Sequence, residues 1–328
     1  MKINFSHPQN FKGYDALALK ALHIEESTSE PIREELKNIA KKENFELRQE
    51  LDYFKWTQDF KTIIEQKGKP VVVVNNRVDE NFLDEMKYRY GIQGKTLDLI
   101  ATGGNSFIGK FPNGDKWMLI GESEFNTKSK KYISKEYEIK EENIFPIPQQ
   151  YYHLDMFLRP IGFPYVLVDS PVLSEKKLAS KDIRQGSYDY ITLNKEFKYW
   201  EQNRSKNYDS HNDVIEALEK AGFKPIQIAG VFGSGINFMN AIINQHQDGT
   251  ISYITNGTKC DSDFITSLQQ DFEKELRQKV PNIRNVYFVN GDDSYTNEMS
   301  NYMMDNLAYR GGGIHCMSLE EPSFELWG

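Results

Sequence analysis

The chain has 328 residues, of which 39% are hydrophobic and 13% aromatic, so it can bury a sizeable core in one large domain or two ordinary ones. No run of roughly 18 apolar residues occurs, which excludes a membrane-spanning helix. The net charge of −8 argues against a nucleic-acid-binding protein and is compatible with a cationic substrate. The N-terminus lacks the apolar stretch of a secretory signal peptide, and two cysteines give no disulfide framework, so we expect a cytoplasmic protein. A short secretion signal read by a dedicated machinery would leave no visible trace.

Apolar runs alternate with amphipathic helical stretches along the chain. In chain order, the patterns predict a strand at 71–75, a hairpin over 105–122, a strand pair around the turn at 161–164, a helix over 211–222, a strand at 224–232, a hairpin around 246–249, a helix over 261–280 and a strand at 285–291. The polar segment 194–213 is interpreted as an insert or loop. The recurring order of hairpin, helix and strand indicates an α/β protein whose hairpins are too frequent for a doubly wound sheet.

Cys316 stands near the end of the chain in the segment RGGGIHCMS (310–318). Three glycines before it free the backbone for tight turns and for close approach of a ligand. His315 is adjacent in sequence, but neighbours on a strand point to opposite faces, so spacing makes it a poor partner for the thiol. A reactive Cys316 therefore needs a base from elsewhere in the chain. We interpret the other cysteine, Cys260, as structural.

His153 and Asp155 are two residues apart in YYHLDMFLRP. On a strand this spacing places both on one face, with an acid/base group beside a carboxylate; the alternative is the exposed polar face of an edge strand. Asp59 lies just before an apolar strand, and the paired glycines of TGGNSF (102–107) mark a turn. No nucleotide-binding glycine motif or zinc-ligand spacing occurs, so we expect no cofactor and no metal.

The order of these segments resembles the guanidine-modifying enzymes of the pentein fold, and most closely the agmatine deiminases and bacterial-type peptidylarginine deiminases. The resemblance covers about residues 45–322 and rests on five segments in family order: Trp56-Thr57-Gln58-Asp59, Thr102-Gly103-Gly104-Asn105, His153-Leu154-Asp155, Ser234-Gly235-Ile236-Asn237 and the terminal Gly311 to Cys316. Two positions depart from the family pattern, because Gln58 stands where arginine is usual and Thr102 where agmatine and arginine deiminases carry a glutamate.

The resemblance implies an α/β propeller of five pseudo-symmetric ββαβ units around a central funnel. It implies one catalytic domain over residues 1–328. Residues 1–45 have no family counterpart, and the helix-like stretch at 296–307 departs from the family pattern and is interpreted as an added lid. Cys316 is then the nucleophile, His153 the general acid and base, and Asp59 and Asp155 the carboxylates that hold a guanidinium. Further expected substrate-binding positions are Trp56, Asn237, Gly313 and Arg310.

The expected function is a cysteine-dependent guanidine hydrolase, a deiminase that releases ammonia and a ureido product through a covalent thiouronium. Agmatine, free arginine and peptidyl-arginine remain open as substrates, and Arg159 and Arg310 are candidates to bind the α-carboxylate of free arginine. An amidinotransferase of the same fold and a catalytically silent binding module are the alternatives. We expect a small-molecule or peptide partner, no nucleic acid and no membrane, and the sequence is compatible with a homo-oligomer.

Overall fold

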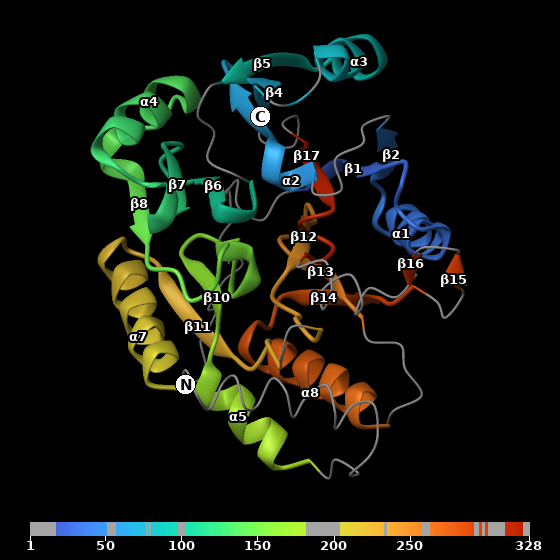
Figure 1. The fold of residues 1–328 in the computed structure, drawn as a ribbon, viewed down its shortest axis with the longest axis vertical. Coiled ribbons are helices and arrows are strands. Elements are labelled where there is room, and N and C mark those ends of the chain that lie inside the picture. Colours follow the sequence, from blue (N-terminus) through green and yellow to red (C-terminus); the bar gives the residue numbers. More distant parts are fainter. Residues whose placement is uncertain are drawn as a thin grey trace.

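The computed structural model describes residues 18–50, 57–76, 78, 80–97, 103–181, 204–232, 235–257, 263–291, 295–296, 299–300 and 312–323. These residues form five three-stranded sheets and one short two-stranded ribbon. The five sheets are arranged as a ring around a central axis, with the helices on the outside (Figure 1).

Each of the five units has the order strand, strand, helix, strand. The second strand is the middle one of its sheet, because it pairs antiparallel with the first strand and parallel with the third. Four units are continuous in sequence: β3 (Lys61–Gln66), β4 (Lys69–Asn75), α3 (Glu80–Tyr90) and β5 (Gln93–Leu97); β6 (Ser106–Lys110), β7 (Lys116–Gly121), α4 (Thr127–Tyr137) and β8 (Ile144–Ile147); β9 (Leu158–Gly162), β10 (Tyr165–Asp169), α5 (Pro171–Ala179), α7 (Arg204–Lys220) and β11 (Lys224–Ile228); β12 (Ala241–Gln245), β13 (Ile251–Asn256), α8 (Asp263–Lys279) and β14 (Ile283–Val289).

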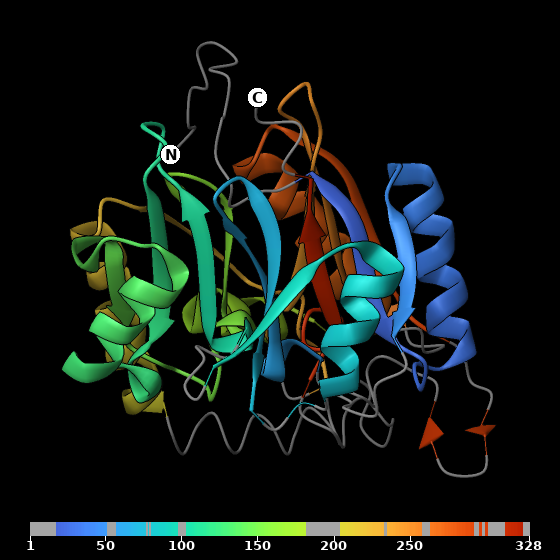
Figure 2. The same ribbon diagram turned by 90° about the horizontal axis from the view of Figure 1, so that it is seen from above.

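The fifth unit joins two distant parts of the chain. Strand β17 (Ser318–Pro322) pairs antiparallel with β1 (Leu19–Glu25), which is followed by α1 (Glu30–Glu43) and the parallel strand β2 (Glu46–Glu50). Figure 2 shows the red β17 standing among the blue strands in the middle of the molecule. Residues 18–45, which have no counterpart in the family motifs, therefore complete the ring, while residues 1–17 lie outside the described residues.

Apolar periodicity explains why these segments form these elements. The run Val71 to Val74 in β4 is nearly all buried because the middle strand of each sheet is covered on both faces. In α8, Leu268, Phe272 and Leu276 recur at four-residue spacing and are fully buried against the strands. Burial of each such side chain stabilises the fold by about 2 kcal/mol. The predicted hairpins over 105–122 and around 246–249 are confirmed as β6–β7 and β12–β13.

Two segments differ from their predicted structure. Residues 204–213 are the first part of α7 rather than a loop, because the helical segment begins seven residues before the amphipathic pattern that predicted it; residues 194–203 lie outside the described residues. The predicted helix over 296–307 is wrong at its start, where Tyr295–Thr296 (β15) pairs antiparallel with Met299–Ser300 (β16). The rest of that segment is outside the described part of the chain.

Short helical turns connect the longer elements. They are α2 (Thr57–Phe60), η1 (Gly103–Asn105), η2 (Glu122–Glu124), η3 (Glu141–Asn143) and η4 (Leu154–Met156). Among the described residues, no helix is long and apolar enough to cross a membrane.

Candidate active site

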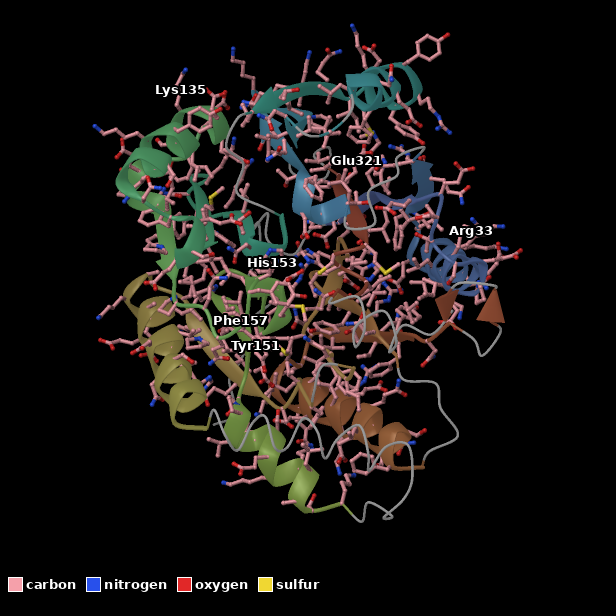
Figure 3. The ribbon with its side chains drawn as sticks, in the orientation of Figure 1. Arg33, Lys135, Tyr151, His153, Phe157 and Glu321 are labelled. Atoms are coloured by element: carbon pink, nitrogen blue, oxygen red, sulfur yellow. The ribbon has the colours of Figure 1, made fainter. Side chains whose placement is uncertain are left out.

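The candidate site is formed by the residues that immediately precede the first strand of each unit. Because the five first strands surround the axis, these segments converge at one end of it, and Figure 3 shows His153 near the centre of the ring. Five residues occupy equivalent places in the five units: Asp59 before β3, Gly104 before β6, Asp155 before β9, Asn240 before β12 and Cys316 before β17. The pseudo-symmetry of the fold thus collects side chains that are up to 257 positions apart in sequence.

The carboxylate of Asp155 is the centre of the polar contacts, and it is completely buried. Its Oδ2 atom accepts hydrogen bonds from Asn240 Nδ2 at 2.8 Å and from the Cys316 thiol at 3.2 Å. The same oxygen lies 2.7 Å from His315 Nδ1. Its Oδ1 atom is buried and has no hydrogen-bond partner. One carboxylate oxygen is therefore bound by the protein, and the other accepts no hydrogen bond from it.

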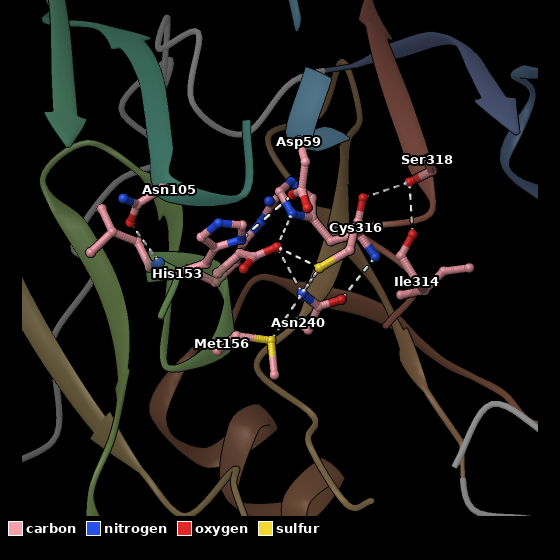
Figure 4. A network of polar contacts seen from close by, with 12 residues as sticks. Asp59, Asn105, His153, Met156, Asn240, Ile314, Cys316 and Ser318 are labelled. Carbon is pink, nitrogen blue, oxygen red and sulfur yellow. Dashed lines mark hydrogen bonds and ion pairs between the residues drawn. The ribbon is translucent and has the colours of Figure 1, made fainter. Parts of the chain in front are cut away.

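Asn240 links the nucleophile to its surroundings. Its Nδ2 atom lies 3.2 Å from Cys316 Sγ as well as 2.8 Å from Asp155, and its Oδ1 accepts the backbone N–H of His315 at 2.9 Å. Figure 4 shows these contacts, with His153 on one side of the network and Cys316 and Asn240 on the other. The amide fixes both the thiol and the turn that carries it.

Asp59 and His153 form the other wall of the site. Asp59 Oδ1 lies 3.5 Å from His153 Nδ1, a distance that permits an ion pair, but neither atom makes a hydrogen bond within the protein although both are buried. The ring of Tyr152 is centred 4.9 Å from that of His153, and its hydroxyl lies 3.6 Å from the Met156 sulfur. Tyr152 is half exposed and forms the rim of the site.

The electrostatics of the site disfavour negative charge. Burial raises the pKa of Asp59 to about 6; the electrostatic interaction with His153 opposes this rise, and the charges of Asp155 and Glu124 add to it. Burial likewise raises the pKa of the Cys316 thiol well above its ordinary value, and the charges of Asp155 and Asp59 raise it further. A backbone hydrogen bond at Gly313 acts in the opposite direction. These influences favour the neutral thiol, and a bound cation would favour both the thiolate and the carboxylates.

Two glycines are required by close approach. A Cβ atom on Gly104 would lie 2.7 Å from His153 Nδ1 and 3.3 Å from carboxylate oxygens of both Asp155 and Asp59. A Cβ atom on Gly313 would lie 2.5 Å from Asn256 Oδ1 and 2.6 Å from Asn240 Oδ1. The first glycine leaves room between the ionisable groups, and the second allows the turn of Cys316 to pack on two asparagines.

No protein-family model matches the sequence, and no curated protein matches it. Among solved structures, the chain is similar to the agmatine deiminase of C. jejuni, with a TM-score of 0.56, 14% identity and coverage of 94% of this chain and 95% of that one. The chain has the pentein fold. The N-terminal domain of ArgZ, an arginine dihydrolase from Cyanobacteria, is also similar, with a TM-score of 0.46, 14% identity and coverage of 92% and 96%. So is the DDAH of Pseudomonas aeruginosa complexed with citrulline, with a TM-score of 0.45, 10% identity and coverage of 93% and 100%.

The pentein arrangement brings together Asp59, His153, Asp155 and Cys316, which were selected from the sequence. The strand expected to carry His153 and Asp155 is wrong, because strand β9 begins only at Leu158. His153 is extended and caps the short turn η4, which contains Asp155. A capped turn nevertheless leaves both side chains at the site, as the expected strand would have done.

The remaining sequence-predicted residues have different places. Asn237 is buried behind the site, where its Nδ2 donates to the Met156 carbonyl at 2.9 Å and its Oδ1 accepts the Met239 N–H at 2.8 Å. Arg159 is also buried and pairs with Glu320 at 2.7 Å, so it is a structural strand residue rather than a group at the rim. Trp56, Cys260 and Arg310 lie outside the described residues.

Sequence reasoning missed Asn240 and His315. His315 was set aside because adjacent strand residues face apart, but residues 314–317 form a turn, in which the ring of His315 reaches Asp155. Asn240 and Asn244 are buried polar residues within the otherwise apolar segment FMNAIINQ (238–245). A buried amide needs hydrogen-bond partners, so this interruption of an apolar run was the available signal.

Proposed function

We propose that the protein is a cysteine-dependent hydrolase of a guanidinium compound, which it converts to a ureido product and ammonia. The observation that carries the proposal is a pair of buried carboxylate oxygens that accept no hydrogen bond within the protein, Asp59 Oδ1 and Asp155 Oδ1, beside the Cys316 thiol. A buried acceptor without a partner costs about 1–3 kcal/mol, so such atoms at a converging site indicate a missing donor. A planar guanidinium supplies several N–H donors and the positive charge that the site lacks.

The first half of the reaction follows from these positions. The cation binds between the two carboxylates, and its charge lowers the cost of ionising the buried thiol. The Cys316 proton passes to His153, the sulfur attacks the central carbon, and a C–S bond forms. His153 then returns this proton to the departing nitrogen, the C–N bond breaks, and ammonia leaves a positively charged thiouronium on the cysteine.

The second half consumes one water molecule. His153 takes a proton from the water, the hydroxide adds to the thiouronium carbon, and the C–S bond breaks with the electron pair returning to sulfur. Of the two protons released, one returns to the cysteine and the other converts ammonia to an ammonium ion. The products are therefore a ureido compound, an ammonium ion and the regenerated thiol. Each step uses one of the four side chains at the site and requires no cofactor.

The substrate class is a guanidinium carried on an alkyl chain, either a small molecule or a peptide. Arg159 does not serve as a partner for an α-carboxylate in this proposal, because it is 4% exposed and paired with Glu320. Arg310 remains the candidate for that contact. We also propose that the catalytic domain spans the whole of residues 1–328 and acts in the cytoplasm.

The test is turnover of agmatine, free arginine and an arginine peptide, measured in parallel as ureido product and ammonia. We expect at least one to be hydrolysed, and Cys316→Ala to abolish its turnover while Cys260→Ala, the matched control at the other cysteine, retains it. No turnover of any guanidinium by the wild-type protein, or equal activity in Cys316→Ala, would overturn the proposal. Transfer of the amidino group to an added amine in place of water would instead identify an amidinotransferase.

A further inference from the structure

His315 lies between the candidate active site and a cavity lined by the strands around the axis. Its side chain is 1% exposed. The Nδ1 atom of its imidazole lies 2.7 Å from Asp155 Oδ2. His315 also forms part of the wall of the cavity, which has a volume of about 70 Å³.

The cavity is built from the first strand of every unit, as expected for a space on the axis. Its wall includes Ile63 of β3, Phe107 of β6, Arg159 of β9, Ile243 of β12 and Glu320 of β17. The cavity therefore belongs to the shared core of the five units and lies away from the carboxylate oxygens that the proposed substrate meets.

A line of charged groups, buried at Arg159 and His315 and partly exposed at Glu320, runs from this cavity to Asp155. Arg159 Nη2 donates to Glu320 Oε1 at 2.7 Å, and Glu320 Oε2 lies 3.8 Å from His315 Nε2. The rings of His315 and Phe107 are centred 5.8 Å apart, and the guanidinium of Arg159 lies 5.2 Å from the centre of the Phe107 ring. The imidazole is thus restrained at both nitrogens and on one face.

The contact with Asp155 determines what each carboxylate oxygen can do. A nitrogen 2.7 Å from a carboxylate oxygen is a donor, so Nδ1 carries the hydrogen. Together with Asn240 Nδ2 and the Cys316 thiol, it gives Oδ2 three donors from the protein. The carboxylate cannot rotate without breaking these bonds. Its Oδ1 atom therefore keeps an orientation in which it accepts no hydrogen bond from the protein.

We propose that His315 is a positioning residue for the reaction: it holds Asp155 so that Oδ2 is bound by the protein and Oδ1 faces the guanidinium. Glu320 and Arg159 hold the imidazole from the cavity side. This inference rests on the proposed function, since it concerns how the same carboxylate meets the substrate. His315 touches neither the substrate nor the reacting atoms in this account.

Two amide variants separate the hydrogen bond from simple packing. In His315→Asn, the side-chain N–H takes the place of Nδ1 and can still donate to Asp155, whereas in His315→Gln it takes the place of Nε2 and points to Glu320. His315→Leu removes both donors. His211→Asn is the distant control, because His211 is also buried but contacts Gln227 at 3.2 Å.

The first measurement does not require turnover. Labelling of Cys316 by 2-chloroacetamidine, a cationic reagent, is compared with labelling by neutral 2-chloroacetamide. The cationic reagent depends on the position of Asp155 Oδ1, and the neutral reagent does not. We therefore expect the rate of labelling by the amidine divided by that by the amide to fall about 10–100-fold in His315→Gln and His315→Leu, the range for a lost hydrogen bond to a charged group. His315→Asn and His211→Asn should stay within about threefold of wild type.

The second measurement is steady-state hydrolysis of whichever guanidinium the wild type accepts. The same loss should appear in kcat/KM of His315→Gln, with recovery in His315→Asn. Equal ratios in His315→Asn and His315→Gln, or a wild-type ratio in folded His315→Leu, would overturn the positioning role. The two proposals can also fail separately. If the wild type prefers the amidine reagent and His315→Gln loses that preference, but the wild type hydrolyses no guanidinium, the positioning role of His315 is supported and the proposed hydrolysis is contradicted.

Discussion

Two buried polar regions of the molecule contrast in how their charges are balanced. The first, which we call the His23 network, comprises His23, Arg48, Glu50, Lys61 and Glu321 in the unit closed by β17 and in β3. Here every ionisable side chain has an opposite charge in contact: Lys61 Nζ lies 3.0 Å from Glu50, His23 lies 3.3 Å from Glu50 and 3.0 Å from Glu321, and Arg48 also binds Glu321.

The second region is the candidate site, where Asp59 has one imidazole beside it, that of His153, and neither Asp59 nor Asp155 contacts a lysine or an arginine among the described residues. Burial alone would raise the pKa of Glu50, but the hydrogen bond from His23 and the charge of Lys61 outweigh it, and the pKa of Glu50 is lowered. Asp59 has only His153 to oppose its burial, and its pKa is raised to about 6. The more deeply buried carboxylate thus has the lowered pKa, because the network supplies its own cations, whereas in the proposed function a bound guanidinium supplies the cation at the site.

The largest effect is expected from breaking the balance of the His23 network. Lys61→Met removes one of the two cationic partners of Glu50, whose side chain is inaccessible to solvent. We expect a loss of about 3–5 kcal/mol in the free energy of unfolding. Denaturant titration measures it. Adding Glu50→Gln to this variant should recover part of the loss, and a single variant as stable as the wild type would show that the pair does not balance the charge.

Filling the space between the ionisable groups of the site should affect activity more than stability. In Gly104→Ala the new methyl group would lie 2.7 Å from His153 Nδ1, so the ring must move. A displacement of about 1 Å at a catalytic group lowers turnover about 100-fold. We expect that loss in kcat/KM with a nearly unchanged melting temperature, and a fully active variant would contradict the convergence of groups at Gly104.

Removing an unbalanced charge from the site should stabilise the protein. The pKa of Asp59 is raised to about 6 in the folded state against about 3.9 in the unfolded chain, so ionised Asp59 disfavours folding above that range. Asp59→Asn should raise the free energy of unfolding at pH 7 by about 2 kcal/mol and abolish turnover. The gain should shrink as the pH falls below about 6 and vanish near pH ~3, where Asp59 is neutral in both states; an equal gain at pH 7 and at pH ~3 would contradict this cause.

The smallest of these effects is the dependence of activity on pH. Neutral Asp59 cannot attract the guanidinium, so kcat/KM should fall about tenfold for each pH unit below about 6. Measurements from pH 4.5 to 8, with circular dichroism as a check that the protein remains folded, test this limb. A constant kcat/KM down to pH 5 would show that ionisation of Asp59 is not required.

Much of the fold could be predicted from local patterns. The hairpins β6–β7 and β12–β13 and the helix α8 follow from periods of two and about four in apolar residues, and the structure confirms them. The pairing of β1 with β17 could not be predicted in this way, because Leu22 lies opposite Glu320 and no local signal joins them. The ring of five units was predicted from the order of the motifs, through the resemblance to the pentein fold.

The sequence predicted the main residues of the candidate site better than it predicted the contacts between them. Asp59, His153, Asp155 and Cys316 could be selected from their motifs, whereas Asn240 and His315 act through contacts with Asp155, 85 and 160 positions away. Sequence spacing also misjudged the backbone at 153–155 and 314–317, because turns and strands give similar short-range alternation of polar and apolar residues.

The pairing of β17 with β1 has a consequence for how the protein matures. Cys316 lies two residues before β17, so the segment that closes the ring also delivers the sulfur to the site. A nascent chain still on the ribosome has the first four units and both aspartates, yet it has no nucleophile until closure. If the proposed function holds, reactivity toward a guanidinium begins only when synthesis has passed this strand, and a chain cleaved ahead of Cys316 loses both the proposed nucleophile and the strand that closes the ring.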